Sequence, residues 1–353
     1  MMRQFRSIVV ISALAAISAA CSANTSAVPS PASPRQVQDL MPGGGTVHYS
    51  IFRDLPGNPS GYPWAIAADP KGSLWVADDV DQDAGPSLIA RIDPDGHRTA
   101  AYYFNSQVLP SFESLVVGPD RNVWIADGGD YLILKMTPSG TFTQYALPNS
   151  DSPMGICVGP DGALWFSANG LRYGVIGRIT AGGDLTIFKH GISDTTQLNG
   201  IAAGPDGALW FTESNKDSIG RITTSGRVTT FSKGITHGSY PLNIAAGSDG
   251  ALWFTESSGG AVAKITTKGA VTEYRHGVES ENPFAIAPGP GGMWFTVIGK
   301  TQQSRIGTIS ADGKMTFYPN LPAGANPYGI VKGPDAKMWF VEQGLNSVGR
   351  VDL

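Results

Sequence analysis

Residues 199–213 read Asn-Gly-Ile-Ala-Ala-Gly-Pro-Asp-Gly-Ala-Leu-Trp-Phe-Thr-Glu, and versions of this phrase return along the chain. Seven of the eight tryptophans mark its copies, which lie 41 to 49 residues apart. They are Trp75, Trp124, Trp165, Trp210, Trp253, Trp294 and Trp339. A strand-rich repeat of about 40–50 residues is typical of a β-propeller with four-stranded blades. The sequence therefore predicts an all-β, seven-bladed propeller.

The copy around Trp210 shows how one repeat divides into strands. Residues 200–204 are short and apolar, which suits an innermost strand, and Pro205-Asp206-Gly207 is a tight-turn signal. Residues 208–212 are apolar on both faces, as expected of a strand between neighbouring sheets. Residues 218–231 supply a third and an outer fourth strand around a glycine turn. We expect four antiparallel strands per blade, with each repeated tryptophan wedged between adjacent blades.

The two ends of the chain complement each other. The last copy stops after its third strand, at residues 347–353, whereas the other six continue into a fourth. Residues 45–52, before the first copy, match the fourth-strand pattern of residues 269–274. We predict that this N-terminal strand completes the last blade and closes the ring without an exposed edge, so that the propeller spans 46–353.

The N-terminal segment predicts export. Residues 1–20 combine basic Arg3 and Arg6 with an apolar run, as in a signal peptide, and the run is too short to span a membrane. Cys21 follows small residues, which is typical of a lipoprotein cleavage site. We expect lipidation of Cys21 and a disordered, Ser/Ala/Pro-rich tether over 21–45, with the protein in the bacterial cell envelope. The alternative is cleavage after Ala20 and a secreted or periplasmic protein.

Composition narrows the class of partner. Only 15% of the residues are charged and the net charge is −4, which gives no electrostatic footprint for nucleic acid or an anionic membrane. We expect membrane contact only through the lipid anchor.

Cys157 is the one other cysteine and falls in an innermost strand, so it is expected to pack rather than react. We expect a monomer.

Propeller geometry indicates where a ligand could bind. The first strand of each blade begins, and the second ends, on one face, around one mouth of the central channel. The residues expected there lie two positions before the Ile or Leu of each first strand, and we call them the mouth residues. They are Trp64, Glu113, Met154, Asn199, Leu242, Phe284 and Tyr328. Several are large and apolar, which favours an amphipathic small molecule, cyclic peptide or glycan; the alternative is that they plug the channel.

The second strands end in acids in five of seven copies, namely Asp78, Asp127, Glu213, Glu256 and Glu342. Convergent carboxylates could hold a hard cation such as Mg²⁺ or Ca²⁺, and Glu213, Glu256 and Glu342 are the candidate ligands. The alternative is that each acid accepts hydrogen bonds from the loop that follows it.

The phrase Gly-x-Leu-Trp-Phe-Thr-Glu, followed by Ile-Gly-Arg-Ile at 219–222, resembles the virginiamycin B lyase (streptogramin lyase) family across the chain after residue 45. The resemblance implies a seven-bladed propeller and Mg²⁺-assisted elimination that opens a cyclic depsipeptide. In that family a histidine of a Glu-x-His-Gly-Ile motif is the base, and the glutamate of a Trp-Phe-Thr-Glu motif lies fourteen residues after it. The same fourteen-residue spacing runs here from Asn199 to Glu213, from Leu242 to Glu256 and from Tyr328 to Glu342.

The histidine of the family motif has no counterpart, because none of the seven mouth residues is histidine. The favoured hypothesis is therefore an exported propeller that binds a ligand or an envelope protein at the channel mouth without catalysis. The second is a divergent Mg²⁺-dependent lyase with a relocated base, either Glu113 or one of His190, His237 and His276. A structural envelope protein without a pocket ligand is the third.

Overall fold

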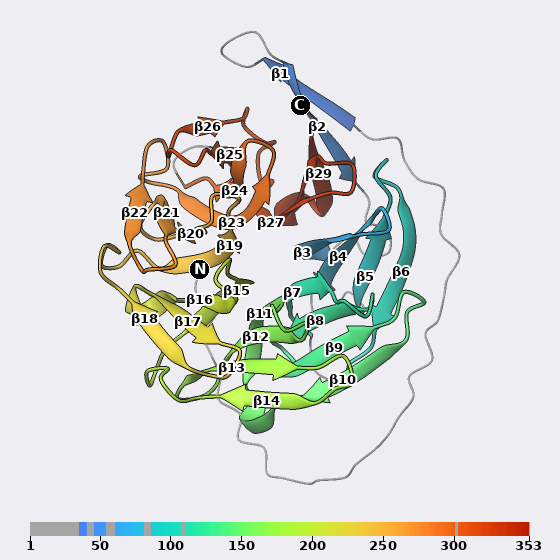
Figure 1. Cartoon of the computed structure of the whole chain (residues 1–353). Helices are drawn as coiled ribbons and strands as arrows, with labels where there is room; N and C mark the ends of the chain where they lie inside the picture. The colour runs from blue at the N-terminus through green and yellow to red at the C-terminus, as the bar shows by residue number, and fades with distance from the viewer. Residues whose placement is uncertain are drawn as a thin grey trace.

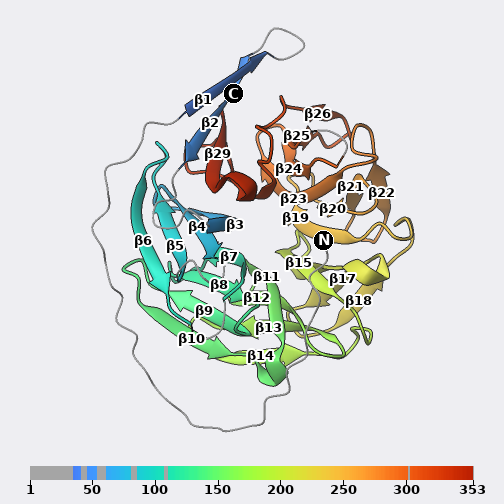
Figure 2. The same cartoon turned by 180° about the vertical axis from the view of Figure 1, so that it is seen from behind.

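The computed structural model describes residues 35–40, 46–53, 61–80, 86–106, 110–300 and 303–352, and of the first two ranges the backbone alone. Seven antiparallel sheets form a ring, with one end strand of each sheet facing its centre (Figure 1, Figure 2). The predicted seven-bladed fold is confirmed. Apart from strands, the described ranges contain the short 3-10 helices η1 (Pro148–Ser150), η2 (Ser214–Lys216) and η3 (Gln343–Leu345). None of the helices in these ranges could cross a membrane.

Each blade has the expected strand order from the channel outward. The innermost strands are β3 (Gly61–Asp69), β7 (Phe112–Val117), β11 (Ser152–Val158), β15 (Leu198–Ala203), β19 (Pro241–Ala246), β23 (Asn282–Gly289) and β27 (Pro327–Lys332). The second strands are β4 (Ser73–Val80), β8 (Val123–Asp127), β12 (Leu164–Asn169), β16 (Ala208–Glu213), β20 (Leu252–Glu256), β24 (Gly292–Ile298) and β28 (Met338–Glu342). The third strands are β5 (Ser87–Ile92), β9 (Leu132–Met136), β13 (Gly174–Ile179), β17 (Ser218–Thr223), β21 (Ala261–Ile265), β25 (Arg305–Ile309) and β29 (Ser347–Asp352). The fourth strands of blades one to six are β6 (Arg98–Phe104), β10 (Phe142–Ala146), β14 (Leu185–Phe188), β18 (Val228–Phe231), β22 (Val271–Tyr274) and β26 (Met315–Phe317).

The ring closes through the N-terminal strand, as predicted. Strand β2 (Thr46–Arg53) pairs antiparallel with β29, from His48 opposite Asp352 to Arg53 opposite Ser347. One further strand was not expected: β1 (Arg35–Leu40) pairs with β2 and extends this sheet to five strands. Residues 35–40 lie within the segment 21–45 for which a tether is expected, and the outer edge of β2 offers them backbone hydrogen bonds.

The hydrophobic core lies between consecutive blades. Trp210 of blade four is fully buried and shares a cluster with Ile244, Leu252 and Phe254 of blade five. The other six repeated tryptophans are equally buried. The predicted wedge is therefore confirmed, and each blade shields the hydrophobic face of its neighbour from water.

The Pro-Asp-Gly turn also orients the tryptophan. Asp206 accepts hydrogen bonds from Trp210 Nε1 at 3.0 Å and from Arg221 Nε at 2.6 Å, while Gly207 takes a positive φ of 72°. Partial burial of Asp206 opposes ionisation, but the bonds from Trp210 and Arg221 together hold its pKa below the ordinary value. The aspartate of the repeat thus binds the indole as well as shaping the turn.

Candidate functional site

Every innermost strand changes register at its mouth residue. In blade four, Leu198 lies opposite Glu213 and the next paired residue is Ile201, so Asn199 and Gly200 bulge out of the ladder. The same shift occurs in the other six inner strands. A bulge redirects side chains out of the normal alternation. It leaves two successive residues unpaired in five blades and one residue, Trp64 or Glu113, in blades one and two. The proline that precedes Trp64, Met154, Leu242, Phe284 and Tyr328 suits this place, because it needs no ladder partner for a backbone N–H.

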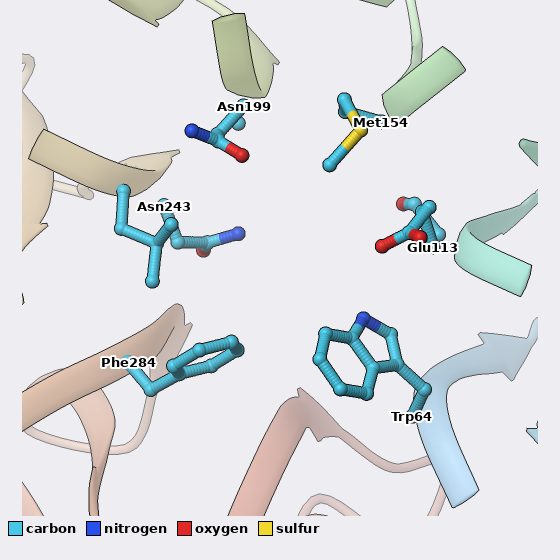
Figure 3. A pocket seen from close by; sticks show the side chains of 10 residues that line it. Trp64, Glu113, Met154, Asn199, Asn243 and Phe284 are labelled. Atoms are coloured by element: carbon cyan, nitrogen blue, oxygen red, sulfur yellow. The ribbon is translucent and has the colours of Figure 1, made fainter. Parts of the chain in front are cut away.

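The bulges surround one pocket of about 130 Å³ (Figure 3). Six of the seven mouth residues line it: Trp64, Glu113, Met154, Asn199, Leu242 and Phe284. Tyr328 is not among the lining residues, but its ring packs on those of Trp64 and Phe284. Ser114, Gly155, Gly200 and Asn243 complete the lining. The predicted convergence is therefore present, and ligand binding by these residues stays a prediction.

One side of the pocket is aromatic. The Trp64 ring centroid lies 4.3 Å from that of Tyr328 and 6.0 Å from that of Phe284, and the Phe284 and Tyr328 centroids lie 4.5 Å apart. These three residues come from blades one, seven and six, which are consecutive in the ring. Their mutual packing fixes the rings before any ligand arrives.

The other side is polar. Glu113 carries the one acidic side chain of the lining, and Ser111 Oγ donates to its Oε1 at 2.7 Å. Burial raises the pKa of Glu113, and the Ser111 hydrogen bond opposes that shift. Asn199 Nδ2 donates to Ser214 Oγ at 2.6 Å, and Asn243 Oδ1 accepts from the backbone N–H of Ile286 at 3.2 Å.

Sequence reasoning missed Asn243 and Ser114. Both lie one residue after a mouth residue, where an unbroken strand would turn the side chain away from the channel. Only the bulge brings them to the pocket. The corresponding position in two other repeats is glycine, Gly155 and Gly200. A polar residue at a position that is glycine in other repeats was the available sequence signal.

Close packing below the mouth explains one of these glycines. A Cβ on Gly200 would lie 2.9 Å from the backbone N of Ile244 and 3.0 Å from the carbonyl oxygen of Leu242. A side chain there would push the neighbouring inner strand away, so the pocket floor requires glycine at this point.

The acids at the ends of the second strands do not line the pocket. Glu213 lies directly opposite Leu198, which is fully buried, and residues directly opposite share one face of a sheet. The carboxylate therefore turns into the blade and not toward the channel. Ser218 Oγ donates to Glu213 at 2.8 Å, and Ser347 Oγ donates to Glu342 at 2.6 Å. These contacts agree with the alternative in which each acid is bound by the segment that follows it.

A Mg²⁺ ion shared by Glu213, Glu256 and Glu342 does not fit this arrangement. Each is buried in its own blade, none lines the pocket, and in the described ranges none belongs to a group of three neighbouring ligand side chains. Glu256 faces an arginine, with Arg275 Nη2 at 3.7 Å from its Oε2. A metal role for these residues stays a prediction that their contacts do not support.

The candidate relocated histidines are also away from the pocket. His190, His237 and His276 are exposed, and the lining contains none of them. His237 Nδ1 lies 3.0 Å from Asp217 Oδ2 in an exposed loop. Glu113 is the one proposed base that the fold places in the pocket.

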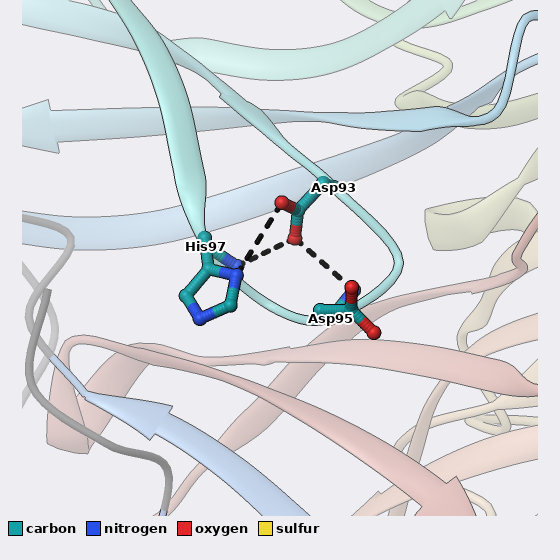
Figure 4. Close-up of side chains that lie close together, drawn as sticks. All are labelled: Asp93, Asp95 and His97. Carbon is teal, nitrogen blue, oxygen red and sulfur yellow. Dashed lines mark hydrogen bonds and ion pairs between the residues drawn. The ribbon is translucent and has the colours of Figure 1, made fainter.

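The described ranges contain one group of three potential metal ligands, Asp93, Asp95 and His97, in the turn between β5 and β6 (Figure 4). Asp93 Oδ1 accepts the backbone N–H groups of Asp95 and His97 at 3.0 and 2.8 Å. These bonds form an aspartate-capped turn on the face opposite the pocket, and we assign no site to it.

Comparisons with known proteins agree with the fold. The sequence model of the virginiamycin B lyase family matches residues 54–302. A catalytically inactive histidine-to-alanine variant of virginiamycin B lyase from Staphylococcus aureus, solved with quinupristin, is 31% identical with a TM-score of 0.78. That match covers 87% of this chain and 99% of the other. A streptogramin B lyase structure is 30% identical with a TM-score of 0.75, covering 87% and 98%. Among curated proteins, none matches.

Proposed function

We propose that this protein, which belongs to the virginiamycin B lyase family, binds an amphipathic ligand at the channel mouth without chemically changing it. The observation that carries the proposal is the composition of the pocket. Its lining combines aromatic rings, two amides and one carboxyl group, and it includes no histidine. Such a pocket can orient a ligand through few polar contacts and bury its apolar part.

The similar solved structure supports the non-catalytic part. In that virginiamycin B lyase, replacement of a histidine by alanine gives a catalytically inactive protein that was solved with quinupristin. In this chain all seven mouth residues are other than histidine. Proton abstraction requires a base within hydrogen-bonding reach of the proton, and an asparagine or methionine cannot provide one.

The direct test is incubation of the purified protein with a streptogramin B depsipeptide and Mg²⁺, followed by mass spectrometry of the ring-opened product. We expect the depsipeptide to stay intact, while virginiamycin B lyase from S. aureus opens it under the same conditions. Ring opening at a rate comparable to that of the control enzyme would overturn the proposal.

Ligand binding itself is tested by thermal unfolding across cyclic peptides, glycans and small amphiphiles. A ligand present at a hundred times its Kd adds about 2.7 kcal/mol to the free energy of unfolding. We expect a stabilising compound whose effect is lost in Phe284→Leu. A purely structural envelope protein would show no such compound.

One observation favours a second candidate, a divergent lyase. Glu113 lines the pocket, and burial raises its pKa toward the range of an effective general base. If the depsipeptide is opened, Glu113→Gln should abolish turnover. Activity retained in that variant, with Mg²⁺ supplied, would exclude Glu113 as the base.

Location in the cell envelope is a separate part of the proposal. Residues 1–34, including Cys21, lie outside the described ranges, so the signal peptide and lipid anchor rest on the sequence. We expect the wild-type chain to fractionate with membranes and Cys21→Ser to be released or retained as an uncleaved precursor. Intact-mass measurement of an unlipidated chain cleaved after Ala20 would contradict the anchor. We expect the protein to be a monomer whose partner is a small molecule, a cyclic peptide, a glycan or an envelope protein.

A further inference from the structure

The channel mouth is divided into two chemically different halves. Consecutive blades six, seven and one supply the rings of Phe284, Tyr328 and Trp64. Blades two, four and five supply Glu113, Asn199 and Asn243, whose polar ends point into the opening (Figure 3). The apolar Met154 lies between Glu113 and Asn199, and Leu242 of blade five also lines this half. A ligand that fills the pocket therefore meets aromatic faces on one side and hydrogen-bonding groups on the other.

The hydrogen bonds around the polar half determine which atoms face a ligand. Ser111 donates to Oε1 of Glu113, and within the described ranges no residue donates a hydrogen bond to Oε2. Asn199 uses its Nδ2 on Ser214, so its Oδ1 faces the opening, whereas Asn243 uses its Oδ1 on Ile286 and presents its Nδ2. These three side chains thus offer two acceptors, one of them a carboxylate when ionised, and one donor.

The ionisable groups around Glu113 are also carboxyls. The lining contains no lysine or arginine that could neutralise it. The half-buried carboxyl of Asp79 lies behind this wall, where it accepts the backbone N–H of Phe112 at 3.1 Å. Burial, followed by the nearby carboxyls of Glu113, Asp127 and Asp78, raises the pKa of Asp79 well above its ordinary value. A positive group at the mouth would meet carboxyl groups and no competing cation of the protein.

Size limits what the pocket can hold. Its volume of about 130 Å³ is close to the roughly 150 Å³ of a protein cavity that accommodates one benzene ring. One small group of a ligand can enter, and a larger ligand must leave its remainder outside the mouth. Cations are attracted to the faces of tryptophan, tyrosine and phenylalanine rings within about 6 Å.

We infer that the pocket recognises an organic ammonium group attached to a small ring or short hydrocarbon, bound between Glu113 and the rings of Trp64 and Phe284, which Tyr328 holds in place from behind. The ammonium donates to Glu113 and to Asn199 Oδ1. The apolar part packs on the rings, and an acceptor on the same ligand can bind Asn243 Nδ2. This inference rests on the proposed function, because it names the chemical class of the ligand for the same pocket.

The test compares three probes of one shape and different charge: 2-phenylethylammonium, 2-phenylethanol and 3-phenylpropionate. Affinities for the full-length protein are measured at pH 8 by ligand-observed NMR titration. We expect the ammonium to bind at least about tenfold more tightly than the alcohol, and the carboxylate not to bind.

Glu113→Gln should bring ammonium and alcohol to similar affinity, and Phe284→Leu should weaken both. Asp184→Asn removes one negative charge from an exposed turn on the opposite face and should change nothing.

The outcomes separate this inference from the proposed function. Equal binding of all three probes, lost in Phe284→Leu, would overturn the cation preference and leave a ligand pocket in place. Absence of Phe284-dependent binding of all three probes would overturn this inference, and the proposed function would fall only if the thermal-unfolding screen also found no Phe284-dependent ligand. The wild-type comparison of the three probes decides the charge preference even if Glu113→Gln fails to fold.

Discussion

Glu213, Glu256 and Glu342 occupy the same place in three blades, yet their surroundings differ. The first and third accept a hydrogen bond from a serine five residues later, Ser218 and Ser347. The residue five after Glu256 is Ala261, which has no hydroxyl group. Glu256 instead faces Glu273 and Arg275. A single alanine thus leaves a fully buried carboxyl without the partner that the repeat provides elsewhere.

The raised pKa of Glu256 makes the stability of the fold depend on pH. Burial, followed by the like charge of Glu273, raises it to about 8, while Arg275 acts in the opposite direction. The folded state then holds a proton that the unfolded state releases near its ordinary pKa of about 4.5. The stability that this proton provides is fully present below that value and is lost as pH rises through about 8.

We therefore expect the free energy of unfolding of wild type to fall, relative to Glu256→Gln, by more than about 1 kcal/mol between pH 5 and pH 9, since one pKa unit corresponds to about 1.4 kcal/mol. Urea unfolding at several pH values measures the difference. Glu279→Gln, at an exposed site, is the matched control and should run parallel to wild type. Parallel curves for Glu256→Gln as well would show that Glu256 titrates normally.

At the scale of elements, hydroxyl groups of the second strands link inner strands of successive blades. Thr255 Oγ1 accepts the backbone N–H of Asn243 at 3.2 Å and donates to the carbonyl of Phe284 in the next blade at 2.7 Å. Ser167, Thr212 and Thr296 make the same pair of contacts in blades three, four and six. These bonds satisfy backbone groups that the bulges remove from the ladder, so they hold the mouth residues in place.

Thr255→Val tests this link because it keeps the shape of the side chain and removes the hydroxyl. It leaves a buried N–H and a buried carbonyl without their partner, which should cost about 1–3 kcal/mol in the free energy of unfolding. Asn243 and Phe284 both line the pocket, so binding of 2-phenylethanol should weaken as well. Thr272→Val, on the exposed side of β22, should change neither quantity by more than about 0.5 kcal/mol. Unchanged stability and binding in Thr255→Val would show that the link is dispensable.

The elements were predictable from sequence to different degrees. Strands and turns around Trp210 were predictable because each copy repeats the same turn signal and the same buried run. The mouth residues converged as expected for the same reason. The bulge itself has no sequence signature, and therefore Asn243 was missed. For Glu213 the sequence left open a cation site or hydrogen bonds from the following loop, because the choice depends on its pairing with the buried Leu198.

At the scale of the whole molecule, the ring is not uniform. The position of Thr255 is taken by Val341, Ala77 and Ala126 in blades seven, one and two, so the hydroxyl link is missing there. Blade seven is also the sheet assembled from both ends of the chain. Its closure was predictable because the last repeat lacks a strand that the N-terminus supplies. Strand β1 was not, because no other blade has a fifth strand to compare with residues 35–40.

We expect the pairing of β2 with β29 to stabilise blades seven, one and two, in which the hydroxyl link is missing. A chain that begins at residue 41 lacks β1 and keeps β2, and we expect it to remain monomeric and to unfold cooperatively. A chain that begins at residue 54 exposes the edge of β29, which six residues of β2 otherwise pair. Unpaired edges recruit other chains, so we expect a lower Tm and association detectable by light scattering. A peptide of residues 44–54, added in excess, should restore the monomer by occupying that edge. If the chain from residue 54 is as stable and monomeric as the one from residue 41, packing between blades alone closes the ring.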